Sequence, residues 1–111
     1  MMKMTGKYIL TRDKKVVPCK TWEMMEEFEN MDDRRVDQTT LPNGRWVSTV
    51  FLCLDHRFGF EMNEGDPLVF ESMVFGNKEL DGHTDELDCE RCCTWDQAVA
   101  LHGKMCERWK G

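Results

Sequence analysis

The chain has 111 residues, of which 41% are hydrophobic and 32% are charged, and its formal net charge at pH 7 is −6. This apolar content excludes an intrinsically disordered chain, and the 8 glycines and 3 prolines are too scattered for a collagen-like sequence. No run of about 18 apolar residues is present, as a membrane-spanning helix would require, and the acidic balance argues against a protein that follows nucleic-acid phosphates. We therefore expect residues 1–111 to form a single domain.

The N-terminal segment is expected to begin with a short strand at Lys7–Leu10, and Val16-Val17 returns beside it after a charged turn. Thr21 is predicted to cap a helix over residues 22–31, because its hydroxyl can accept a hydrogen bond from the first helical turn. Methionine and phenylalanine recur along that segment at three- and four-residue spacing, which is typical of a helix face packed on a core.

The middle of the chain predicts an antiparallel sheet. Residues 35–41 are rich in valine and threonine, and Asn43-Gly44 follows them, which is a strong signal for a hairpin. Residues 46–54 are nearly all apolar or β-branched, so we expect a central strand covered on both faces. A second apolar strand is expected at residues 68–75, and after an acidic loop a short strand at residues 89–92.

The C-terminal segment is predicted to be an amphipathic helix that packs on this sheet. Thr94 and Gln97 have the spacing of a capping box. The residues that share one helical face after the cap are Trp95, Ala98, Val99, His102, Met105, Cys106 and Trp109. Together these elements predict an α+β fold, with an antiparallel sheet of about four to five strands and two packed helices.

Three segments of the chain carry a resemblance to a known family. Residues 47–56 read VSTVFLCLDH, residues 67–75 read PLVFESMVF, and residues 94–102 read TWDQAVALH. In this order, with an aromatic-glycine loop between the first two, they resemble a family of small proteins from tailed phages and prophages. The resemblance covers most of the chain and implies an intracellular phage accessory protein, in a family without an assigned activity.

The cysteines are the main departures from the family pattern. Cys53 stands where glycine is usual, and Cys92-Cys93 stand where Tyr-Ser is usual. The first residues are too polar for a signal peptide, so a cytoplasmic location and free thiols are expected. The six cysteines are Cys19, Cys53, Cys89, Cys92, Cys93 and Cys106.

One group of these cysteines has the spacing of zinc ligands. Cys89 and Cys92 are separated by two residues, and His102 and Cys106 lie one helical turn apart. Cysteine and histidine on an apolar helix face are more often core residues, and the family pattern has no ligand at Cys92. We therefore expect no cofactor, with zinc kept as the alternative.

A second group combines carboxylates with imidazoles, namely Asp55, His56, Glu71 and His102. Glu71 interrupts an apolar strand, and a buried carboxylate requires a partner. We expect His102 to face the sheet and to contact Glu71 or the strand end at Asp55-His56. Three roles remain open for this polar cluster: a structural network, contact with a ligand or partner, and acid–base catalysis.

Six acidic residues fall between Glu79 and Glu90, in the predicted loop over residues 76–88 and in the short strand expected after it. These acids are Glu79, Asp81, Asp85, Glu86, Asp88 and Glu90. The segment is either a solvated loop or a patch that attracts a basic partner.

The sequence predicts a non-enzymatic phage accessory protein that binds a host or phage macromolecule, with interference in a bacterial defence system as one form. The alternative is a small-molecule or metal-binding protein, or a hydrolase, that uses Asp55, His56, Glu71 and His102. Neither nucleic acid nor a membrane is an expected partner.

Overall fold

A computed structural model of the chain describes residues 7–19, 21, 34–53 and 67–111. The helix expected over residues 22–31 lies outside the described residues, and so do Asp55 and His56.

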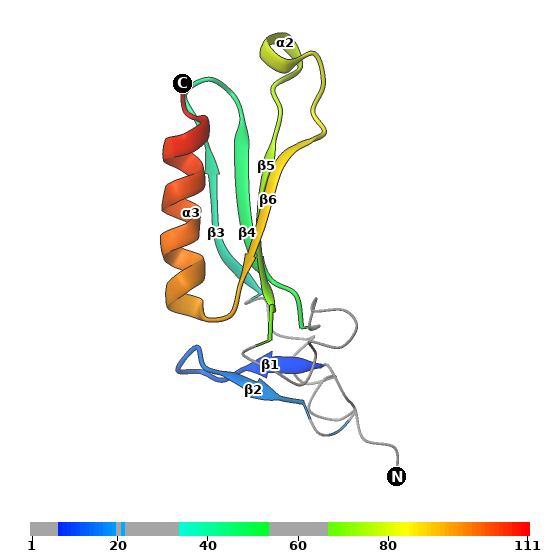
Figure 1. The fold of residues 1–111 in the computed structure, drawn as a ribbon, viewed down its shortest axis with the longest axis vertical. Coiled ribbons are helices and arrows are strands. Elements are labelled where there is room, and N and C mark those ends of the chain that lie inside the picture. The colour runs from blue at the N-terminus through cyan, green and yellow to red at the C-terminus, as the bar shows by residue number, and fades with distance from the viewer. Residues whose placement is uncertain (1–6, 20, 22–33, 54–66) are drawn as a thin grey trace.

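The described residues form two antiparallel sheets and two helices, which confirms the α+β class (Figure 1). A two-stranded sheet pairs β1 with β2, and a four-stranded sheet has the order β3-β4-β5-β6. The elements are β1 Tyr8–Leu10, β2 Val16–Pro18, β3 Arg35–Thr40, β4 Trp46–Phe51, β5 Phe70–Phe75, α2 Lys78–Asp81, β6 Glu86–Cys92 and α3 Trp95–Trp109. Within the described parts of the chain, no helix is long and apolar enough to span a bilayer.

The β3–β4 hairpin forms at the predicted position. The backbone N–H of Leu41 donates to the carbonyl of Arg45 over 2.7 Å, and that of Gly44 donates to the carbonyl of Leu41 over 2.8 Å. Gly44 has a φ of 87°, a left-handed conformation that side chains other than glycine adopt only with strain. A Cβ at this position would also overlap the side-chain amide of Asn77. Both the backbone conformation and the contact with Asn77 therefore favour glycine here.

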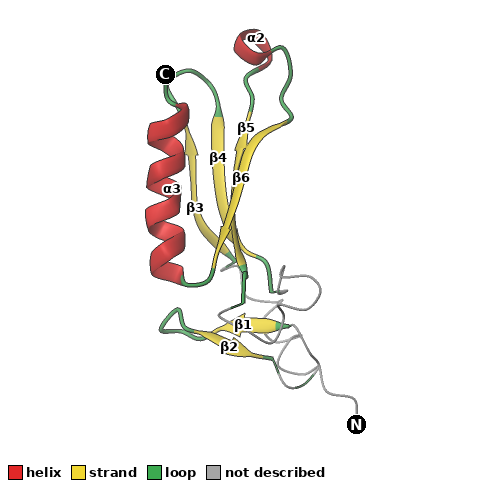
Figure 2. Ribbon diagram, viewed as in Figure 1, coloured by secondary structure: helices red, strands yellow, loops and turns green. Residues whose placement is uncertain are grey.

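Helix α3 begins at the predicted capping box, in which the Thr94 hydroxyl accepts from the Gln97 N–H and the Gln97 side chain accepts from the Thr94 N–H. The helix lies along one face of the four-stranded sheet (Figure 2). Its buried residues are Ala98, Leu101, His102 and Met105. They pack against the alternate residues of β4 and β5 that point to the same side.

The structure corrects the expectation that the central strand is covered on both faces. Only every second residue of β4 is buried, beginning with Val47. The opposite face carries Trp46, which is 37% exposed and stacks on Phe75 with 5.2 Å between ring centroids. Among the described elements, α3 covers one face of the sheet. The residues of β4 that point to this face are therefore the buried ones.

The acidic segment contains a short helix and the start of a strand, where the sequence predicts a loop. Helix α2 begins after Asn77, whose side chain accepts hydrogen bonds from the backbone of Glu79 and Leu80, and it ends at Gly82 with a φ of 83°. Strand β6 then begins at Glu86, three residues before the predicted start. Pairing with β5 extends the strand through its acidic residues, which sequence propensity alone disfavours.

Candidate functional site

The buried histidine of α3 is the centre of a hydroxyl network between the helix and the sheet. His102 is 5% exposed, so its position facing the sheet is as predicted. Its Nδ1 lies 2.7 Å from Thr49 Oγ1, and its Nε2 lies 2.9 Å from Thr39 Oγ1. Thr49 Oγ1 in turn lies 2.8 Å from Ser72 Oγ. The network therefore joins α3 to β3, β4 and β5.

Burial keeps this imidazole neutral. Desolvation lowers the pKa of His102, and the carboxylate of Asp37, 3.7 Å from Nε2, raises it by a smaller amount. A neutral imidazole has one donor and one acceptor nitrogen, so a hydroxyl on each side satisfies both. Thr49 and Ser72 are 0% exposed, and a substrate cannot reach a nucleophile there. This arrangement has the features of the structural network rather than of acid–base catalysis.

The structure corrects the expected partner of His102. Glu71 alternates with the buried residues of β5 and therefore lies on the face of the sheet opposite α3. Its carboxylate accepts a hydrogen bond of 3.0 Å from Nε of Arg91, which lies directly across from it on β6. Glu71 thus obtains its partner from the neighbouring strand, and it does not belong to one cluster with His102.

The zinc ligand set is also not assembled. Cys89 lies opposite Met73 and Cys92 lies opposite Phe70 in the β5–β6 pairing, so the two thiols point to opposite faces of the sheet. Two cysteines separated by two residues can bind one metal ion when they lie in a turn. In a strand, the same spacing directs their side chains to opposite faces of the sheet. Among the residues that the structure describes, no group of three or more Cys, His, Asp or Glu side chains can hold a metal.

The cysteines on β6 and α3 have little thiolate character. Cys89, Cys92 and Cys106 are free thiols. Burial is the largest cause of the raised pKa at Cys89, to about 12, and at Cys92, to about 11. Burial also raises the pKa of Cys106. Because the thiolate is the reactive and metal-binding form, these three thiols are suited to packing.

The six acidic residues of the predicted patch divide into two groups. Asp81 pairs with Arg45, and both Asp88 and Glu90 pair with Arg108 of α3. Glu79, Asp85 and Glu86 are exposed; we refer to these three residues as the acidic tip. The tip lies at the α2 end of the molecule, away from the β1–β2 hairpin (Figure 1).

The role of Arg45 is not predicted from the sequence. Its guanidinium donates from Nε to Asp81 over 3.0 Å and from Nη1 to the carbonyl of Trp109 over 3.1 Å. Asn43 donates to the same carbonyl over 2.8 Å. This cluster, the Arg45 clamp, ties the β3–β4 turn to α2 and to the last turn of α3. The arginine beside Asp81 lowers the pKa of that carboxyl to about 2.

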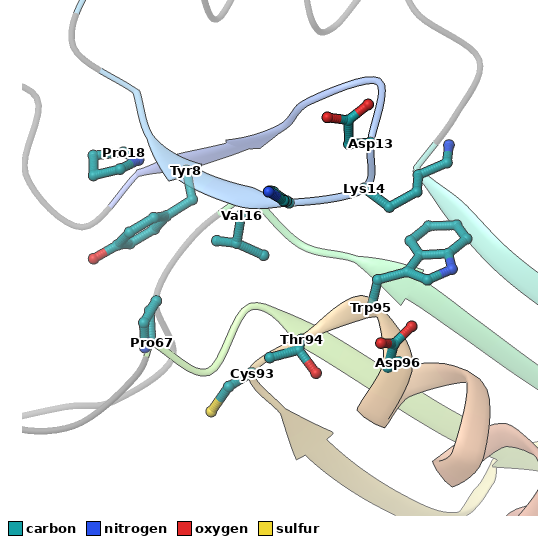
Figure 3. Close-up of a pocket in the computed structure, with 11 residues that line it drawn as sticks. Tyr8, Asp13, Lys14, Val16, Pro18, Pro67, Cys93, Thr94, Trp95 and Asp96 are labelled. Atoms are coloured by element: carbon teal, nitrogen blue, oxygen red, sulfur yellow. The ribbon is translucent and has the colours of Figure 1, made fainter.

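A cavity of about 860 Å³ lies between the β1–β2 hairpin and the start of α3 (Figure 3). It is also absent from the sequence predictions, because its walls come from segments far apart in the chain. The lining residues are Tyr8, Asp13, Lys14, Lys15, Val16, Pro18, Pro67, Cys93, Thr94, Trp95 and Asp96. Its volume lies in the range of about 300–1,000 Å³ that is typical of ligand pockets.

Comparisons with protein-family models, with curated proteins and with solved structures found no match to this chain.

Proposed function

We propose that this chain is a small non-enzymatic phage accessory protein that binds a basic surface on a host or phage macromolecule through its acidic tip. The observation that carries the proposal is the division of the acids. Asp81, Asp88 and Glu90 are used internally, whereas Glu79, Asp85 and Glu86 are exposed. The phage origin rests on the resemblance of the three sequence segments.

The acidic tip also has an apolar component. Leu80 follows Glu79 on α2 and is 56% exposed. An exposed apolar side chain beside unpaired charges is a common combination at protein interfaces, where charge accelerates encounter and apolar burial supplies affinity. The tip is therefore better suited to a protein partner than to a phosphate backbone.

The charge of the acidic tip also affects the rate of binding. A concentrated negative surface attracts a basic partner over a distance and accelerates their encounter.

The experiment is a pull-down from bacterial lysate, with and without phage infection, that compares two variants of equal charge. The tip variant combines Glu79→Gln, Asp85→Asn and Glu86→Gln. The control variant neutralises three other exposed acids through Asp13→Asn, Asp96→Asn and Glu107→Gln. We expect a discrete partner that the tip variant loses and the control retains. A partner retained by both variants, or no specific partner, contradicts the proposal.

The alternative function, a hydrolase or metal protein that uses the predicted polar cluster, loses support. Glu71 and His102 lie on opposite faces of the sheet, so they cannot act on one substrate. The cavity at the start of α3 favours a different form of small-molecule binding, which uses other residues.

A further inference from the structure

The face of the four-stranded sheet that points away from α3 has an apolar centre. Residues directly opposite each other in antiparallel strands share a face, so the registers of β4, β5 and β6 bring five apolar side chains together there. They are Trp46, Val50, Met73, Phe75 and Cys89, and we refer to them as the outer patch. Trp46 is 37% exposed, and the other four are partly exposed.

Charged side chains of β6 flank the outer patch at its two ends. Glu86 lies opposite Phe75 and Arg91 lies opposite Glu71 in the β5–β6 pairing, so both point to the face that carries the patch. Burial is the main cause of the raised pKa of Cys89, and the charges of Arg91 and Glu86 also act on this thiol. That influence agrees with a common face for the three residues.

Glu86 and Arg91 can both make a contact outside their own chain. Glu86 is exposed. Arg91 donates from Nε and Nη2 to a single oxygen of Glu71, over 3.0 and 2.9 Å, and its side chain is still 39% exposed. A guanidinium has five N–H donors, so it can bind a second carboxylate. Glu86 of the same chain is not that carboxylate, because the two residues are about 15 Å apart along the strand.

We propose that the outer patch is a dimer interface, in which two copies of this chain pack sheet against sheet with antiparallel strands. A two-fold axis that crosses the strands near Met73 places β6 of one copy over β6 of the other. Glu86 of each copy then faces the partner's Arg91, and the apolar side chains of both patches are buried between the sheets. Sheets that pack face to face lie about 10 Å apart.

The charges select this orientation over the other two-fold arrangement. An axis parallel to the strands would place β3 over β6. Arg35, which lies opposite Val50 in the β3–β4 pairing, would then face the partner's Arg91, and like charges that meet in an interface oppose binding. The antiparallel arrangement instead pairs opposite charges at both ends of the patch.

The size of the face predicts a weak dimer. It spans four strands and the six residues of β4 and of β5. At about 4.8 Å per strand and about 3.4 Å per residue, its flat area is roughly 400 Å² per copy. Stable interfaces bury about 800 Å² per partner. We therefore expect a dissociation constant between about 10 µM and about 1 mM.

The test is analytical ultracentrifugation of the purified full chain at concentrations from about 10 µM to about 1 mM. Trp46→Ala removes the largest side chain of the patch and should weaken self-association by at least about tenfold. Val99→Ala is the matched control, because Val99 is an exposed apolar residue of α3, and it should leave self-association unchanged. A chain that stays monomeric throughout this range overturns the proposal, and so does an equal effect of both variants.

Charge reversal tests the orientation. Glu86→Arg and Arg91→Glu should each weaken self-association by at least about tenfold, because like charges then meet at both contacts. A mixture of the two variants should form a heterodimer, because the positive charges of one variant then face the negative charges of the other. Glu107→Arg, on α3, changes the net charge as Glu86→Arg does and is the control. No heterodimer, or an equal loss in the control, overturns the proposal.

Two further points keep the outcome decisive. The Trp46→Ala result does not depend on Arg91, so it tests the interface even if Arg91→Glu does not fold. Glu86 also belongs to the acidic tip, and the double variant Glu79→Gln, Asp85→Asn leaves it in place. That variant should keep the dimer, and loss of the dimer would contradict the proposal. Because self-association is measured on the purified chain, failure of this test is distinct from failure of the proposed function.

Discussion

At the scale of single residues, His102 is the most informative side chain in the molecule. A buried imidazole on an apolar helix face needs a polar partner on each nitrogen. The sheet supplies hydroxyls from Thr39 and Thr49, and Ser72 completes the chain behind Thr49. No buried side-chain nitrogen or oxygen among the described residues lacks a hydrogen-bond partner, so the network is fully satisfied.

Removal of one partner from this network should destabilise the fold. We expect His102→Leu to lower the free energy of unfolding by about 1–3 kcal/mol, because the buried Thr49 hydroxyl loses its hydrogen bond to Nδ1 and keeps Ser72 as its partner. Thr49→Val should have a comparable effect, because it removes the hydroxyl that pairs with Nδ1 of the buried His102. The measurement is urea unfolding of both single variants and of the double variant.

The double variant decides whether the two residues act as a pair. If they do, its loss of stability is smaller than the sum of the single losses. A strictly additive result would mean that His102 and Thr49 contribute independently, and the network would then not hold the helix on the sheet.

At the scale of secondary-structure elements, local sequence signals and tertiary contacts act together. The Asn43-Gly44 turn is favoured locally, and the structure adds a contact between Asn77 and this turn, where the side-chain amide donates to the carbonyl of Asn43 over 3.0 Å. Helix α2 has only four residues, too few to be stable alone. It persists because Asn77 caps its start and Arg45 binds Asp81 at its end.

Two glycines should therefore respond in opposite ways to the same substitution. Gly44→Ala is expected to lower stability by more than about 1 kcal/mol, because alanine is strained at this positive φ and its Cβ overlaps Asn77. Gly103→Ala is expected to raise stability by about 0.5–1 kcal/mol, since this residue lies inside α3 and a Cβ there meets no atom within 4 Å. Thermal unfolding of the two variants measures both effects, and a shared sign would contradict the described backbone at one of the two positions.

At the scale of the whole molecule, the two ends of the four-stranded sheet are held by different interactions. The Arg45 clamp ties the β3–β4 turn, α2 and α3 together at the end that carries the acidic tip. The other end joins the β1–β2 hairpin to the main sheet through an apolar cluster that includes Leu10, Phe51 and Phe70. The acidic tip and the cavity at the start of α3 therefore lie at opposite ends of the molecule (Figure 1).

The free energy of unfolding should fall in two steps as the pH is lowered. The pKa of His102 is lowered from 6.5 in the folded state, chiefly by burial, so the unfolded chain binds the proton more readily. Stability is therefore lost as pH falls below 6.5, until the lowered pKa is passed. The pKa of Asp81 is lowered from 3.8 to about 2, first by its hydrogen bond to Arg45. Its contribution is present above pH 3.8 and is lost as pH falls toward about 2.

Each step can be assigned with one variant, by urea unfolding across the pH range. His102→Leu should remove the first decline, and Arg45→Gln should reduce the second. If the first decline persists unchanged in His102→Leu, another group is responsible for it, and the burial argument for this imidazole is wrong.

Much of the fold and part of the site could be predicted from local sequence. The Asn43-Gly44 turn, the capping box at Thr94 and the inward position of His102 all depend on residues a few positions apart. Backbone preference and helical periodicity act over that distance, so they are readable without a structure. The same holds for the antiparallel pairing of β3 with β4, because residues 41–45 join them in a short turn.

The partners of these residues were decided only by the tertiary structure. Glu71 and His102 are both in predicted elements, but strand alternation places Glu71 on the face away from α3. The register of β5 against β6 then sets Arg91 opposite it. The same alternation separates Cys89 from Cys92, and the cavity arises where a distant hairpin meets the start of α3. Sequence determines which side chains need a partner, whereas register and packing determine which partner each one receives.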